Sequence, residues 1–153
     1  MLQARNNYRF AQVILIILAA INIARGLFHY LAPDSGSHIV AGMDISAASG
    51  ANIVYLLAVI GALQFVNGLL FLYIALRQKG LTLAAFWYVL LTSAMVLPLN
   101  FVFKQPAAPV PGRFANILEF AVALVTICLI IYFEKKSARD GKSKNSEGGV
   151  GKQ

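Results

Sequence analysis

The sequence predicts an all-α membrane protein in which four helices form a transmembrane bundle. Of the 153 residues, 59% are hydrophobic and 12% are charged, whereas a soluble domain carries about 25% charged residues. Four apolar stretches are each long enough to cross about 30 Å of hydrocarbon, which takes about 20 helical residues. Most basic residues lie between or beyond these stretches, as in proteins that cross a membrane several times.

The four spans are predicted to be helices because lipid offers backbone N–H and C=O groups no other hydrogen-bond partner. Their approximate bounds are 10–31, 53–76, 81–103 and 114–133. A segment of nine residues precedes the first span, and the tail 134–153 is predicted to be disordered because it is rich in Gly, Ser and Lys. The first span is similar to a signal peptide, but Asn22 stands where cleavage wants a small residue, so we expect an uncleaved span.

The basic residues also predict an orientation, because cytoplasmic loops carry an excess of Lys and Arg. The N-terminal segment, the short loop 77–80 and the tail together carry ten basic residues, whereas loop 32–52 carries none. Loop 104–113 has Lys104 and Arg113 at its edges. We therefore predict that both termini are cytoplasmic, in a plasma membrane of bacterial type (an inner membrane), with two outward loops.

Composition also excludes several function classes. The net charge of +7 does not indicate a nucleic-acid partner, because six of the thirteen basic residues lie in the last nineteen positions. Cys128 is the single cysteine, which excludes the four-helix thiol oxidoreductases that need cysteine pairs. We find no catalytic constellation in the sequence. His29 and His38 lack further ligands at a recognised spacing, so we expect no metal and no cofactor.

Polar residues inside two spans are the main functional signal. Asn22, Arg25 and His29 follow i, i+3, i+7 spacing on one face of the first span, and Asn116 and Glu119 begin a similar stripe on the fourth. Arg25 lies six residues, about 9 Å, below the outer end of its span, and Glu119 lies five residues, about 8 Å, below the start of its own. We therefore predict a contact between Arg25 and Glu119 that makes the first and fourth helices neighbours.

The Arg25–Glu119 pair can be interpreted in two ways. A charge at the centre of a membrane helix costs about 2.5–3.5 kcal/mol, and a carboxylate partner for Arg25 lowers that cost. The pair is then a structural clasp that sets helix register. Ionisable residues inside membranes are also hypotheses for substrate or proton sites. The sequence leaves both readings open.

The second and third spans add polar and small residues. Gly61, Gln64 and Gly68 share one face of the second span, where glycines allow close helix approach and an amide can hydrogen-bond a neighbour. Pro98 is predicted to kink the third span near its outer end, with Asn100 two residues further on. These groups are expected to line a pocket that opens outward.

The leading hypothesis is a non-catalytic binding or accessory protein whose pocket takes a lipid headgroup, a quinone or another small amphiphile. Arg25 would hold an anionic or carbonyl group, and Glu119 would fix the guanidinium. The predicted ligand-binding residues are Asn22, Arg25, His29, Asn100, Asn116 and Glu119. Expected partners are membrane lipids, with a homodimer or a larger membrane complex as a further expectation, and no nucleic acid.

Two other function classes fit the sequence less well. One is a proton-coupled small-molecule carrier that acts as a dimer through Glu119, although a paired arginine would hold that carboxylate charged and so oppose proton coupling near neutral pH. The other is an enzyme, for which the sequence offers no nucleophile–base pair and no paired catalytic carboxylates.

In its layout the chain resembles small bacterial membrane proteins of the DoxX-like kind. The shared features are four spans, polar residues late in the first span, a longer first outward loop and a basic tail. The resemblance covers residues 10–133 in architecture, and it implies the four-helix fold without assigning a function to any residue. The small multidrug carriers also have four spans, but their essential glutamate lies in the middle of the first, where this chain has Asn22 and Arg25.

Overall fold

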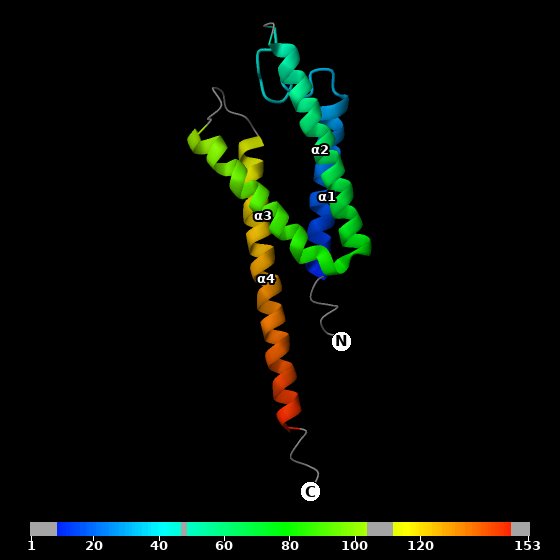
Figure 1. Ribbon diagram of the computed structural model, residues 1–153, viewed down its shortest axis with the longest axis vertical. Helices are drawn as coiled ribbons and strands as arrows, with labels where there is room; N and C mark the ends of the chain where they lie inside the picture. Colours follow the sequence, from blue (N-terminus) through cyan, green and yellow to red (C-terminus); the bar gives the residue numbers. More distant parts are fainter. Residues whose placement is uncertain (1–8, 47–48, 104–111, 148–153) are drawn as a thin grey trace.

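The computed structural model describes residues 9–46, 49–103 and 112–147, and every regular element among them is helical (Figure 1). The elements in chain order are α1 (Arg9–Leu31), α2 (Gly50–Arg77), the 3-10 turn η1 (Lys79–Leu81), α3 (Thr82–Pro98), the π-helical segment η2 (Leu99–Phe103) and α4 (Gly112–Glu147).

Four helical segments are long and apolar enough to cross a membrane, which confirms the predicted number of spans. They are Arg9–Leu31, Gly50–Arg77, Lys79–Phe103 and Phe114–Asp140. Large apolar side chains cover their outer surfaces, with Leu56 and Leu63 of α2 exposed by 58% and 62%. Exposed apolar surface on this scale needs an apolar environment, so the four helices indicate a multi-pass membrane protein built as a helical bundle.

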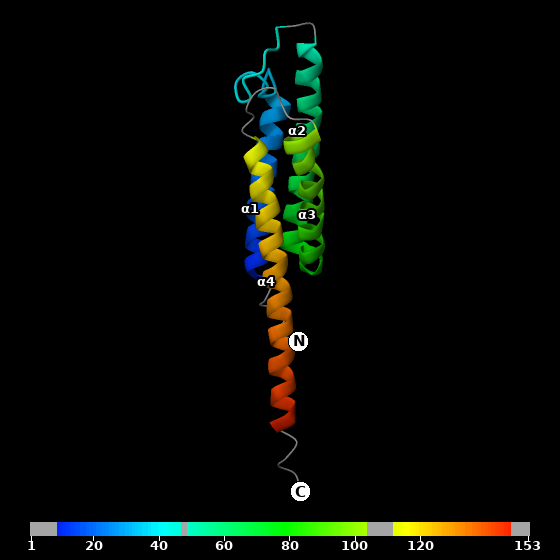
Figure 2. The same ribbon diagram turned by 90° about the vertical axis from the view of Figure 1, so that its left-hand side faces the viewer.

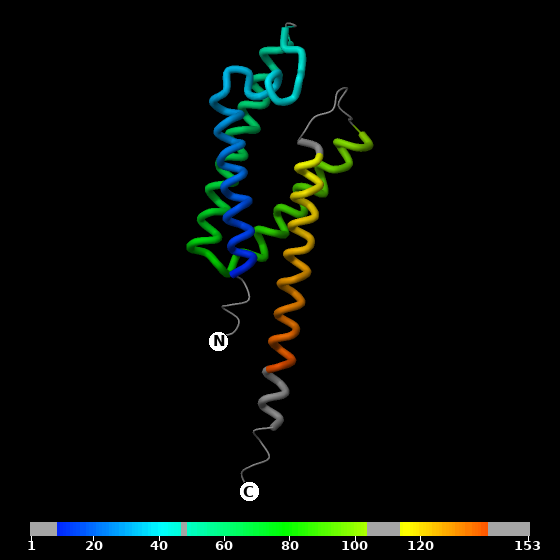
Figure 3. The backbone as a smooth tube through the Cα atoms, turned by 180° about the vertical axis from the view of Figure 1, so that it is seen from behind, coloured from blue at the N-terminus to red at the C-terminus, as the bar shows by residue number. Residues whose placement is uncertain are grey.

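The helices are arranged as two hairpins. α1 and α2 lie side by side along most of their length, whereas α3 is inclined and crosses α4 (Figures 1 and 3). α1 begins and α4 ends at the same end of the bundle, and the turn between α2 and α3 also lies there (Figure 2). The segment 32–46 lies at the opposite end, which we call the loop end (Figure 1).

The buried core lies in the half of the bundle nearest the chain ends. Leu15 at the start of α1, Phe86 at the start of α3 and Ile130 late in α4 are almost fully buried, and Phe71 of α2 joins them. The ring of Phe10 packs edge-on against that of Phe133, with centroids 5.9 Å apart. This contact joins α1 to α4, as the sequence predicts. The two hairpins therefore pack against each other at this end of the bundle.

Glycines bring α1 and α2 into backbone contact. A Cβ atom added at Gly26 would lie 2.7 Å from the carbonyl oxygen of Gly61, and one added at Gly61 would lie 2.7 Å from Cβ of His29. At Gly68 an added Cβ would meet Cγ1 of Ile23 at 2.7 Å. No other residue type fits these spaces, so the predicted packing role of Gly61 and Gly68 is confirmed.

The outer end of the third span changes helix type at its proline. α3 ends at Pro98, which has no N–H to donate, and η2 continues as a π-helix over the next turn. The predicted disturbance at Pro98 is therefore a change of helical pitch in the structure.

The carboxyl end differs from the prediction. α4 continues as a helix to Glu147, across fourteen residues of the segment 134–153 that the composition predicts to be disordered. Lys, Arg and Ala are good helix formers, and a helix that is already nucleated inside the bundle adds further turns at low cost. Residues 148–153 of the predicted tail and residues 1–8 lie outside the described residues.

Candidate functional site

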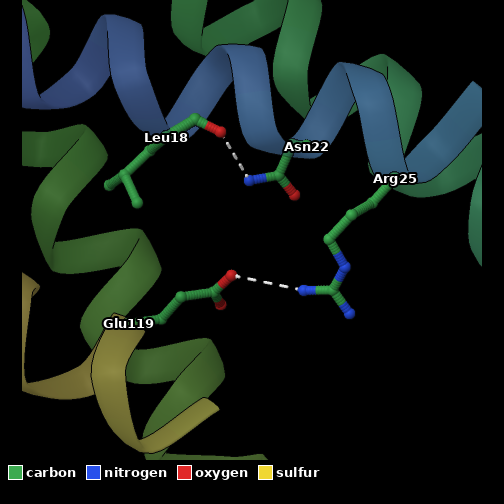
Figure 4. A network of polar contacts seen from close by, with 4 residues as sticks. All are labelled: Leu18, Asn22, Arg25 and Glu119. Carbon is green, nitrogen blue, oxygen red and sulfur yellow. Dashed lines mark hydrogen bonds and ion pairs between the residues drawn. The ribbon is translucent and has the colours of Figure 1, made fainter. Parts of the chain in front are cut away.

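An ion pair joins the two hairpins in the half of the bundle nearest the loop end. Nη1 of Arg25 on α1 lies 3.8 Å from Oε1 of Glu119 on α4 (Figure 4). The predicted contact is therefore confirmed. The distance is about 1 Å longer than a charge-assisted hydrogen bond, and the two side chains are 36% and 27% exposed. The guanidinium thus keeps donors free for another acceptor.

A large groove lies beside this pair, between α1 and α4. Its volume is about 770 Å³, which is within the usual range for small-molecule sites. Its walls are mainly apolar, with Ile17 and Ile21 of α1 facing Leu118 and Val122 of α4. Arg25, His29, Gln64 and Glu119 are its charged or hydrogen-bonding side chains.

A smaller cavity of about 270 Å³ is lined by residues of all four helices. Its lining is rich in amides and hydroxyls, which come from Asn22, Gln64, Asn67, Tyr88, Thr92, Ser93 and Asn116. Gln64 and Glu119 line both this cavity and the larger groove. The two spaces therefore meet at one polar position, and we call them together the seam.

Gln64 carries an unsatisfied buried atom. Its Oε1 is inaccessible to solvent and has no hydrogen-bond partner. Leaving such an acceptor unpaired costs about 1–3 kcal/mol. Buried polar groups are normally paired, so an orphan beside two cavities indicates a place where a donor from a bound molecule or a water fits.

Asn22 serves its own helix. Its Nδ2 donates to the carbonyl oxygen of Leu18 at 2.9 Å (Figure 4). This bond orients the amide, and the side chain lines the smaller cavity between Leu18 and Asn116.

His29 connects α1 to the loop that follows it. Its Nδ1 lies 2.7 Å from the carbonyl oxygen of Ser35. A carbonyl accepts hydrogen bonds but cannot donate them, so Nδ1 carries the proton. This bond holds the loop over the groove, where Gly36, Val40 and Met43 form part of the lining.

The same loop is organised by Asp34. Its carboxylate accepts backbone N–H bonds from Ile39 at 2.8 Å and from Gly36 and His38 at 3.0 Å. The Ile39 bond is the main cause that lowers the pKa of Asp34 below its ordinary value of 3.8, against the opposing effect of burial. Gly36 adopts a φ of +76° at the turn, which glycine allows without strain. The chain therefore turns directly after Pro33.

Five of the six predicted site residues line the seam. Asn22 and Asn116 line the smaller cavity, Arg25 and His29 line the groove, and Glu119 lines both. Asn100 differs, because it lies in η2 and lines neither space. The π-helical pitch after Pro98 changes the direction of residues there, and periodicity counted on an α-helix does not follow that change.

Other lining residues were not among the predicted site residues. Tyr88 donates from its hydroxyl to Oδ1 of Asn67 at 3.5 Å, across the gap between α3 and α2. Gln64 is visible in the sequence as an amide near the membrane midplane. Tyr88 carries no comparable signal, because an aromatic residue two turns into a span also suits the membrane interface.

The chemistry available at the seam is binding and proton exchange. The described residues contain no group of three or more His, Cys, Asp or Glu side chains that could hold a metal ion. What the seam offers is a guanidinium donor, amide donors and acceptors, one carboxylate and a long apolar wall. These groups suit a molecule with a polar head and an apolar body.

Comparisons with known proteins return no relative: no protein-family model, curated protein or solved structure matches this chain. The resemblance to DoxX-like proteins therefore stays a prediction.

Proposed function

We propose that this protein is a non-catalytic membrane protein that binds a small amphiphile in the seam. The observation that carries the proposal is the position of Arg25, Gln64 and Glu119, where an apolar groove of about 770 Å³ meets a polar cavity. A lipid, a quinone or a similar amphiphile would place its head at this position and its apolar part along Ile17 and Ile21. The polar residues then hydrogen-bond the head, and the apolar wall covers the chain.

The proposed setting is a plasma membrane of bacterial type, with both termini in the cytoplasm. The charge distribution supports this orientation, because ten basic residues lie at the N-terminus, at 77–80 and in the tail. In that orientation the charged end of the groove, at Arg25 and Glu119, lies in the outer half of the bundle, under the loop that His29 and Asp34 hold in place. Membrane lipids are its immediate partners, and a homodimer or larger complex stays a prediction.

Photolabelling tests the proposal. The full-length protein is placed in nanodiscs with a small fraction of a photoactivatable acyl probe, either as the free acid or as its glycerol ester. We expect labelling of α1 and α4 along the groove to exceed labelling of the exposed face of α2, where Val66 and Leu70 line neither space and report ordinary lipid contact. Arg25→Gln should lower groove labelling to the α2 level. Equal labelling of both faces in the unaltered protein would contradict the proposal.

A second function, a proton-coupled carrier, is favoured by one observation. Glu119 is the carboxylate that lines both spaces, so a proton on it would change the polarity of the whole seam. Its test is the pH dependence of groove labelling. A carrier of this kind predicts a dependence near neutral pH that disappears in Glu119→Gln, whereas the binding proposal predicts labelling that does not depend on pH there.

A further inference from the structure

We infer that the amphiphile of the seam is uncharged and carries both a carbonyl and a hydroxyl group in its head, as a monoacylglycerol does. This inference rests on the proposed function and narrows its ligand class. It follows from the charge balance of the groove, from the unpaired atom of Gln64 and from the shape of the apolar wall.

The charge balance favours an uncharged head. Arg25 and Glu119 carry the formal charges among the described residues that line the groove, and they cancel. An anionic head bound to Arg25 would stand within a few ångströms of the Glu119 carboxylate, where the low dielectric strengthens repulsion between like charges. A carbonyl oxygen accepts from the guanidinium without that repulsion. The free donors of Arg25 therefore suit a neutral acceptor.

The unpaired acceptor of Gln64 favours a ligand head that carries a hydrogen-bond donor. Oε1 of Gln64 is buried without a partner, and the Glu119 carboxylate, which lines the same two spaces, offers two more acceptor oxygens. The terminal torsion of a glutamine has a broad energy minimum, so its amide turns easily toward a bound group. A hydroxyl supplies the missing donor. A quinone, whose head has carbonyl acceptors and no donor, leaves Oε1 unpaired, and so does a simple ester.

The apolar wall of the groove suits a single extended acyl chain that enters from the surrounding lipid. From Arg25 to Ile14 the groove follows eleven residues of α1, about 16 Å at 1.5 Å per residue. Ile17 and Ile21 are 53% and 43% exposed, so the groove opens sideways along this length. A single acyl chain entering from the side would cover these residues while its head stays at Arg25 and Gln64.

Competition against the photoactivatable glycerol ester tests this inference. The unlabelled competitors are monolauroylglycerol, methyl laurate and laurate, which share one chain and differ in the head. Monolauroylglycerol is expected to compete about tenfold more strongly than methyl laurate, as pairing one buried acceptor implies. Laurate, which is anionic, should also compete weakly. Because this comparison uses the unaltered protein, it does not depend on how any variant folds.

A variant pair assigns the preference to Gln64. Gln64→Leu removes the acceptor and should make monolauroylglycerol and methyl laurate equal competitors. Gln78→Leu is the matched control, because Gln78 lines neither space and its amide nitrogen donates to the Tyr73 hydroxyl. The control variant should keep the tenfold preference.

The outcomes separate this inference from the function on which it rests. Groove labelling that methyl laurate or laurate suppresses as well as monolauroylglycerol does would overturn the inference and leave amphiphile binding intact. A preference for monolauroylglycerol that survives in Gln64→Leu would overturn the assigned role of Gln64. Absence of groove labelling above the α2 level with either probe would overturn both.

Discussion

Helix α1 meets α2 and α4 in opposite ways. Toward α2 it presents Gly26, and the two backbones touch with no space for a single added carbon. Toward α4 it presents Arg25, whose charged group stands 3.8 Å from its partner beside a groove of about 770 Å³. One interface thus gives α1 a fixed position through backbone contact, and the other leaves room. The polar residues that are energetically costly in a membrane span lie at the interface with α4, beside the groove.

The difference suggests a division of roles. In a membrane the hydrophobic effect does not drive apolar side chains together, because lipid tails are equally apolar. Helices therefore associate through close packing and hydrogen bonds. The α1–α2 contact supplies close packing. The seam lacks it and has polar groups instead, which is a costly arrangement unless something binds there.

The largest expected effect comes from a substitution that disrupts the tight interface between α1 and α2. In Gly61→Ala the new Cβ would lie 2.7 Å from Cβ of His29 and 2.9 Å from backbone atoms of Gly26 and Tyr30. We expect the free energy of unfolding to fall by about 3 kcal/mol, measured by denaturant titration in mixed micelles. Gly80→Ala is the control, since an added Cβ there meets nothing within 4 Å. Equal stability of the two variants would show that the backbones do not touch as described.

A pair of identical substitutions compares the two sides of α1. Ile23 lies against Gly68, whereas Ile21 lines the groove and is 43% exposed. Ile23→Phe should cost about 2 kcal/mol because the added volume meets backbone, and Ile21→Phe should cost less than about 0.5 kcal/mol. The same unfolding titration measures both. A reversed order would mean that the groove is filled in the folded protein.

A double-mutant cycle measures how far the ion pair holds the seam. Arg25→Gln, Glu119→Gln and the double variant should give a coupling energy of about 1 kcal/mol, which is modest because both side chains are partly exposed and the distance is long. Thermal unfolding in detergent without added monoacylglycerol is the measurement. A coupling near zero would remove the clasp role and leave ligand binding as the reason for the arginine.

The smallest effect is local and depends on pH. The lowered pKa of Asp34 means that its bonds stabilise the loop above the ordinary value of 3.8, and that this contribution is lost as pH falls through the lower folded value. Amide hydrogen exchange at Gly36, His38 and Ile39 should therefore accelerate in strong acid. Asp34→Ala should show fast exchange at every pH.

Asp44→Ala is the control for that experiment, because among the described residues its carboxylate accepts hydrogen bonds from Ser46 and from none of the three loop amides. Exchange at Gly36, His38 and Ile39 in this variant should match the unaltered protein. If Asp44→Ala instead reproduced the acceleration, the loop would not depend on Asp34.

The sequence by itself determined the number of spans and the level of the charged pair. Four apolar stretches of sufficient length can only be helices in lipid, and the rise of 1.5 Å per residue places Arg25 and Glu119 at one depth. Periodicity also placed Gly61 and Gly68 on a packing face, because small residues at these spacings serve close contact. These are local properties of the chain, and the structure confirms them.

Only the tertiary structure decided which faces of the helices pack against one another. The inclination of α3, the groove between α1 and α4, and the unpaired atom of Gln64 arise from the packing of elements far apart in sequence. The π-helical turn that takes Asn100 away from the seam, and the continuation of α4 to Glu147, depend on how each helix end is supported. Spacing along one helix determines which residues share a face, whereas the neighbour that face meets is set by contacts among all four.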